Sequence, residues 1–108
     1  MEIKATQQKI YATAKSKGWY DKERTFGDVI TLVHSELSEA YEEYRNGHEM
    51  VAIRIEKGKP EGIPVELADA VIRIFDCAEH YGIDLEAAIE LKMWYNEKRE
   101  YRHGNKVS

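Results

Sequence analysis

Residues 33–44, V-H-S-E-L-S-E-A-Y-E-E-Y, place two kinds of side chain on neighbouring stripes of a predicted helix. Glu36, Glu39 and Glu43 recur at spacings of three and four, which brings them within about 60° of one another around an α-helix. The stripe beside them is apolar and consists of Val33, Leu37, Ala40 and Tyr44. Because like charges at these spacings repel, the carboxylates need solvent or a divalent cation such as Mg²⁺, which prefers oxygen ligands. The stretch therefore predicts a helix with one buried side and a solvated or metal-binding shoulder.

The composition predicts one soluble domain. The chain has 108 residues and a formal net charge of −4, which allows one modest core and argues against a binder of nucleic-acid polymers. Cys77 is the only cysteine, so no internal disulfide can form, and a lone thiol without a signal peptide predicts a cytoplasmic location. No apolar run approaches the length of a membrane span, so no membrane partner is expected.

Hydrophobic periodicity and helix-stop residues predict an all-α fold with helices over residues 3–17, 26–46, 64–81 and 85–102. Thr25 and Asp28 fit a capping box at the start of the second helix, and Asp84 suits the N-cap of the fourth. The alternation over residues 51–55 predicts a short strand or extended arm. The loop that follows, K-G-K-P-E-G at 57–62, carries two lysines that are either solubilising or in contact with phosphates, if the loop folds over a site.

Apolar stripes also predict which faces are buried. On the second helix the expected buried residues are Phe26, Val29, Ile30, Val33, Leu37, Ala40 and Tyr44. On the third they are Leu67, Val71, Ile74, Phe75 and Ala78, and the opposite stripe is polar, with Glu66, Asp69, Arg73, Asp76 and His80. Periodicity alone leaves open whether this polar stripe is a solvated face or a site. The first helix has a weak apolar stripe, so we expect the chain to complete its burial against a second subunit.

The fourth predicted helix changes character along one face. Its core side begins with Leu85, Ala88 and Ile89 and continues as Lys92, Asn96, Arg99 and His103. An amide without a long aliphatic stem needs a hydrogen-bond partner when it is buried. This face is therefore predicted to line a polar, anionic cavity.

Two carboxylate pairs, Glu36 with Glu39 and Glu66 with Asp69, lie on consecutive long helices. If these helices pack antiparallel, the four carboxylates converge, and hard oxygen donors of this kind suit Mg²⁺ or Mn²⁺. Magnesium in proteins commonly bridges to phosphate oxygens, so a phosphorylated substrate is the natural partner. The cationic side chains of the fourth helix would then neutralise phosphate charge, and its asparagine would orient an oxygen or a water.

The ordered set of blocks resembles the MazG-like family of all-α nucleoside triphosphate pyrophosphohydrolases. The blocks are H-S-E-L-S-E-A-Y-E-E-Y-R-N-G at 34–47, G-K-P-E-G-I-P-V-E-L-A-D at 58–69 and K-M-W-Y-N-E-K-R-E-Y-R-H-G at 92–104. The resemblance covers nearly the whole chain as a single domain, residues 1–108, and is weakest over the first helix. It implies an antiparallel four-helix bundle, completed by assembly into a homodimer or homotetramer.

The same resemblance implies Mg²⁺-dependent cleavage of an NTP or dNTP between its α- and β-phosphates, which yields a monophosphate and pyrophosphate. It assigns the metal to Glu36, Glu39, Glu66 and Asp69. It assigns substrate contacts to Lys92, Asn96 and Arg99, and a base contact to Trp19.

Rival classes of protein make different demands. A ferritin-like di-iron bundle needs two Glu-x-x-His motifs, whereas this chain has one, from Glu100 to His103. A helical DNA-binding module is disfavoured by the acidic balance. Two readings stay open: a non-catalytic helical interaction domain, which predicts no metal-dependent turnover, and a phosphoribosyl-ATP pyrophosphohydrolase with the same metal motif.

Overall fold

The computed structural model describes residues 2–99. Its elements are α1 (Ile3–Ser16), α2 (Phe26–Arg45), β1 (Arg54–Glu56), β2 (Lys59–Glu61), α3 (Ile63–His80) and α4 (Leu85–Lys98). The expected all-α class is confirmed, with four helices in this part of the chain and one small hairpin. The fourth helix was expected to reach residue 102, but it ends at Lys98, and Arg99 has an extended backbone, so the expected helix is wrong at Arg99. The rest of that prediction, and His103, fall outside the described residues. No helix between residues 2 and 99 is both long and apolar enough to cross a membrane.

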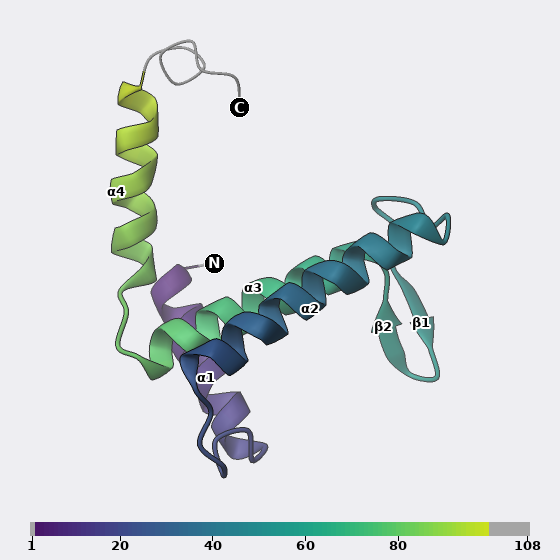
Figure 1. Ribbon diagram of the computed structural model, residues 1–108, viewed down its shortest axis with the longest axis horizontal. Helices are drawn as coiled ribbons and strands as arrows, with labels where there is room; N and C mark the ends of the chain where they lie inside the picture. The colour runs from purple at the N-terminus through teal and green to yellow at the C-terminus, as the bar shows by residue number, and fades with distance from the viewer. Residues whose placement is uncertain (1, 100–108) are drawn as a thin grey trace.

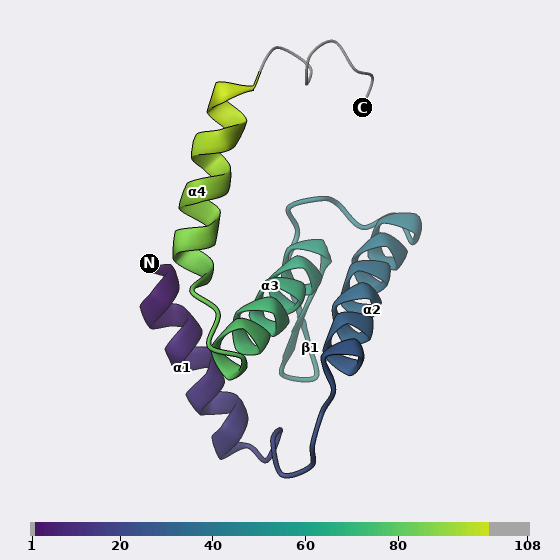
Figure 2. The same cartoon turned by 60° about the vertical axis from the view of Figure 1, so that its left-hand side comes forward.

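The centre of the fold is the antiparallel pair of α2 and α3, and α1 packs against α3 (Figures 1 and 2). The start of α2 is fixed by the expected capping box. The Thr25 hydroxyl accepts from the Asp28 backbone N–H at 3.0 Å, and the Asp28 carboxylate accepts from the Thr25 N–H at 3.1 Å. These bonds satisfy two donors that the first helical turn would otherwise leave unpaired. The two longest helices, α2 and α3, run side by side, and their carboxylates can meet only in such an arrangement.

The connection between α2 and α3 is an antiparallel hairpin rather than a single extended arm. Lys57 and Gly58 have positive φ values of 52° and 78°, as a two-residue turn between strands requires. Arg54 ties the hairpin to α2, because its terminal nitrogens donate to both oxygens of Glu43 at 2.9 and 3.0 Å. At Gly62 the φ is 133°, and a Cβ would collide with the Ala52 carbonyl oxygen. Glycine there lets the hairpin return closely to the first turn of α3.

The predicted buried faces were wrong in part. On α3, Phe75 and Ala78 are buried as expected, but Leu67, Val71 and Ile74 are 46%, 45% and 41% exposed. The polar stripe contributes buried residues instead, among them Glu66 and Asp76. The physical reason is that α3 lies between α1 and α2, so the side that carries its carboxylates is covered on both flanks.

A similar correction applies to α2. Its buried apolar residues are Val29, Val33 and Ala40, whereas the expected core residues Phe26, Ile30, Leu37 and Tyr44 are exposed. The exposed residues recur at helical spacing along one stripe. Both central helices therefore present apolar stripes that this chain does not cover with its described residues.

The fourth helix projects away from the α2–α3 pair and packs mainly against α1 (Figures 1 and 2). Its N-cap is as expected, because the Asp84 carboxylate accepts from the Ala87 N–H at 3.0 Å. It contributes no buried residue in the described chain. A closed four-helix bundle is thus not formed by one chain here, and the bundle completed by assembly stays a prediction.

Candidate metal centre

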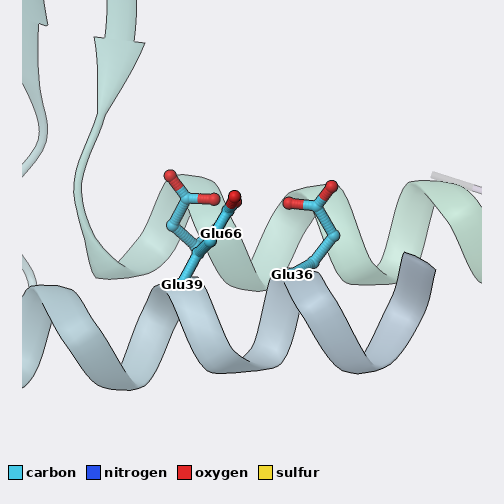
Figure 3. Close-up of side chains that lie close together, drawn as sticks. All are labelled: Glu36, Glu39 and Glu66. Carbon is cyan, nitrogen blue, oxygen red and sulfur yellow. The ribbon is translucent and has the colours of Figure 1, made fainter. Parts of the chain in front are cut away.

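Three of the four predicted metal ligands meet between α2 and α3. Each of Glu36, Glu39 and Glu66 offers a carboxylate oxygen, and these oxygens all lie within 4.8 Å of one another. Glu36 and Glu39 come from successive turns of α2, and Glu66 reaches the same place from the first turns of α3 (Figure 3). Glu36 and Glu66 are each only 8% exposed. The antiparallel packing that the sequence analysis required is therefore present.

Asp69 lies at the same cavity but outside this tight group. It lines a cavity of about 360 Å³ together with the three glutamates, Lys59 and Arg73. Its carboxylate is not among the ligand atoms that lie within 4.8 Å of one another. Asp69 comes one helical turn after Glu66 and lines the same cavity without joining the tight group of oxygens.

Two carboxylates of the cavity have raised pKa values. Burial raises the pKa of Glu66 to about 7, and the nearby charges of Glu39, Asp69 and Glu36 add to the effect. The pKa of Asp69 is also raised, first by burial and then by the charge of Glu36. Groups of like charge that are removed from water favour a proton or a cation between them. At Glu66 and Asp69 this appears as a preference for the protonated form.

Arg73 was not singled out by the sequence analysis, which placed it only on the polar stripe of α3. Its Nε donates to Glu36 Oε1 at 2.9 Å, and its guanidinium lies 4.7 Å from the Trp19 ring centre. The guanidinium of Arg24 is closer to the same ring, at 3.7 Å. The signal available in the sequence was the spacing of four between Asp69 and Arg73, which puts both side chains on one side of α3.

Trp19, the predicted base contact, lines a second cavity of about 380 Å³. This cavity adjoins the carboxylate cavity, because Ile72 and Arg73 line both. Its other walls include Ile10 and Ala14 from α1. The two cavities together form a continuous surface from the carboxylates to an aromatic ring.

The structure does not bring the predicted substrate contacts of α4 to these cavities. Lys92 and Asn96 are exposed, and Lys92 and Arg99 lie 4.7 and 5.6 Å from the Tyr95 ring centre. The cation that reaches the carboxylate cavity from outside the central helices is Lys59 of β2. The sequence analysis had left open whether this loop lysine was solubilising or at a site, and the hairpin places it at the cavity.

A second acidic group shares one member with the first. Oxygens of Glu43, Glu61 and Glu66 lie within 4.8 Å of one another. Both carboxylate oxygens of Glu43 already accept hydrogen bonds from Arg54, and these bonds lower the pKa of Glu43. We therefore interpret Glu43 as an anchor for the hairpin rather than as a metal ligand.

Comparisons of the chain with protein-family models, curated proteins and solved structures found no match. The argument for function therefore rests on the residues and the geometry described above.

Proposed function

We propose that this protein is a Mg²⁺-dependent nucleoside triphosphate pyrophosphohydrolase, which cleaves an NTP or dNTP between its α- and β-phosphates. The observation that carries the proposal is the convergence of Glu36, Glu39 and Glu66 in a cavity that also contains Lys59 and Arg73. Clustered acidic oxygens alone suit many cations. Acidic oxygens with two cationic side chains beside them suit a metal ion that is bound together with an anion such as a polyphosphate.

The donor set fits a hard divalent cation. Glu36, Glu39 and Glu66 would hold Mg²⁺, or Mn²⁺ in its place, and Asp69 would contribute from the cavity wall. The raised pKa of Glu66 supports this assignment, because burial and then the neighbouring carboxylates disfavour its charged form, and a bound cation would offset both. When bound, such an ion polarises the phosphate and lowers the pKa of a coordinated water.

The cationic residues of the chain have separate tasks in this proposal. Lys59, on the hairpin, is a flexible point charge that can follow a phosphate as it enters the cavity. Arg73 is held by Glu36 through Nε, so its position is fixed before the substrate binds. Preorganised charge of this kind stabilises a transition state without the cost of reorientation. Trp19, which lines the adjoining cavity, would contact the base.

We further propose a homodimer or homotetramer in the cytoplasm. The support is the pair of exposed apolar stripes on α2 and α3, together with an α4 that has no buried residue. Burial of such stripes against a second copy is a common solution for a short helical chain. Contacts from Lys92, Asn96 and Arg99 to the substrate would require assembly of this kind, because they lie away from the carboxylate cavity of their own chain.

The test is a panel of canonical and modified NTPs and dNTPs with and without Mg²⁺, with separate detection of monophosphate, diphosphate and pyrophosphate. We expect monophosphate and pyrophosphate, only with metal, and loss of this turnover in Glu39→Gln and Asp69→Asn. Glu42→Gln is the matched control, because Glu42 is on α2 but 60% exposed.

Other outcomes discriminate between the classes of protein. Folded wild-type protein without turnover of any nucleotide would support a helical interaction domain. Turnover confined to phosphoribosyl-ATP would indicate the related enzyme class. Wild-type activity in Glu39→Gln would remove the metal assignment.

A further inference from the structure

Asp76 is a buried acid that the proposed reaction does not use. It lies on α3, seven residues after Asp69, and lines the cavity that contains Trp19. It is only 6% exposed, and its Oδ1 has no hydrogen-bond partner among residues 2–99. Burial raises the pKa of its carboxyl group. Oδ1 is closed off beside the Tyr20 hydroxyl, so the oxygen left for a ligand in the cavity is Oδ2.

The surroundings of Asp76 keep it in place. Burial and the adjacent Asp76 raise the pKa of Tyr20, yet the Tyr20 hydroxyl also lacks a hydrogen-bond partner in the described chain. The Tyr20 ring stacks on His80 at 4.5 Å between centres, which fixes its position. The Tyr20 hydroxyl and Asp76 Oδ1 are natural partners of each other, and a hydrogen bond from Tyr20 partly offsets the effect of burial on the pKa of Asp76. Oδ2 then remains as the acceptor on the cavity side.

The remainder of the cavity suits a flat heterocycle. Its volume of about 380 Å³ is within the range of about 300–1,000 Å³ that is typical of small-molecule sites. Trp19 and the Arg73 guanidinium that lies over its ring form one wall, and Ile10, Ala14 and Ile72 supply apolar walls. Because Ile72 and Arg73 also line the carboxylate cavity, a nucleotide with its phosphates at the carboxylates can place its base here.

We propose that Asp76 accepts a hydrogen bond from an exocyclic amino group of the base, so that the substrates are nucleotides of cytosine or adenine. This inference rests on the proposed function for its phosphate end only. A carboxylate offers acceptors and no donor, and it pairs with the amino group of cytosine in known recognition. Uracil, thymine and hypoxanthine carry a carbonyl oxygen where cytosine and adenine carry the amino group. That oxygen would face the carboxylate as a second acceptor.

The kinetic test uses pairs of substrates that differ at this group. We compare kcat/KM for dCTP with dUTP, and for dATP with dITP, in the presence of Mg²⁺. Wild-type protein should prefer the amino-bearing member by at least about tenfold, the scale of one hydrogen bond to a charged group. In Asp76→Asn the ratio should fall towards one, since an amide can donate as well as accept. Asp84→Asn is the control, because asparagine also serves as an N-cap and α4 is away from this cavity.

A binding measurement separates this inference from the proposed function. Calorimetric titration with dCMP and dUMP needs neither metal nor turnover, and tighter binding of dCMP that Asp76→Asn abolishes would support the role of Asp76. Such discrimination without any hydrolysis of dCTP would leave the inference intact and remove the proposed function. Hydrolysis of dCTP and dUTP at equal rates by the wild type would overturn the inference, whether or not Asp76→Asn folds.

Discussion

The raised pKa of Glu66 leads to a prediction about the stability of the protein. Glu66→Gln removes a negative charge from the cavity and keeps the size and polarity of the side chain. The pKa of Glu66 is raised from its ordinary 4.5 to about 7, so the folded state binds a proton more tightly than the unfolded state does. The charged form is therefore disfavoured by folding, and without metal the variant should be more stable than the wild type at neutral pH.

The magnitude follows from the shift. A difference of one in pKa corresponds to about 1.4 kcal/mol, which sets an upper bound of about 3 kcal/mol for the penalty at Glu66. Glu39 is exposed and the cavity is open to water, so part of the repulsion is screened. We expect Glu66→Gln to raise the free energy of unfolding by about 1–3 kcal/mol at pH 8 in the presence of a chelator.

The sign of the pH dependence is fixed by the direction of the shift. Below about pH 4.5 Glu66 is protonated in both states and the penalty is absent. It grows as the pH rises from 4.5 to 7 and is complete above 7. The advantage of Glu66→Gln should therefore be near zero at pH 4.5 and largest at pH 8. Added Mg²⁺ should stabilise the wild type more than the variant, because a ligand bound to the folded state raises its stability.

The assay is urea unfolding of wild type and Glu66→Gln at several pH values and at one protein concentration, followed by circular dichroism. Glu42→Gln is the control and should have little effect, since Glu42 is exposed and its ion pair with Arg45 is long, at 3.8 Å. A variant that is less stable than wild type at pH 8 would refute the reasoning. A gain of equal size at pH 4.5 and pH 8 would refute it as well.

Three other predictions concern the frame and the surface of the protein. Gly62→Ala should lower the free energy of unfolding by about 2 kcal/mol or more, because of its positive φ and the collision with a backbone carbonyl; Gly47→Ala, with open space around it, should cost less in the same urea titration. Leu67→Asp should weaken self-association in sedimentation equilibrium while the helical circular dichroism persists, since Leu67 is 46% exposed in one chain. Lys92→Ala should lower kcat/KM by roughly 10²-fold, whereas Lys98→Ala should change it little; equal small effects would remove α4 from the site.

Features that depend on local chemistry were predictable. The capping box of Thr25 and the N-cap at Asp84 formed as the sequence indicated, because each satisfies backbone donors within one turn of the same helix. Three of the four carboxylates that were expected to converge do so, because helical spacing fixes which carboxylates share a side and antiparallel packing of consecutive helices is common. The convergence of Glu36, Glu39 and Glu66 thus needed only one assumption about tertiary structure.

Features that depend on distant neighbours were not predictable. Leu67 was expected in the core because it lies on an apolar stripe, but a stripe does not specify whether its partner is in the same chain or another. Asp76 was grouped with a polar stripe, and only the packing of α1 and the Tyr20 segment against α3 shows that it is buried. The position of Lys59 at the cavity was not predictable either, because it depends on how closely the hairpin returns to α3 at Gly62.

The position of Arg73 connects the two cavities in one electrostatic arrangement. Only its Nε takes part in the side-chain hydrogen bonds of residues 2–99, as donor to Glu36, so the terminal nitrogens are free to donate to an anion. If Glu36 held a metal ion, less of its negative charge would be directed at Arg73, and the guanidinium would attract a phosphate more strongly. The same guanidinium lies over the Trp19 ring, 4.7 Å from its centre, so a base in that cavity would contact both side chains. The orientation of Glu36, the phosphate and the base would therefore all depend on Arg73, and a lysine there would keep the charge but lose the planar group that makes these contacts together.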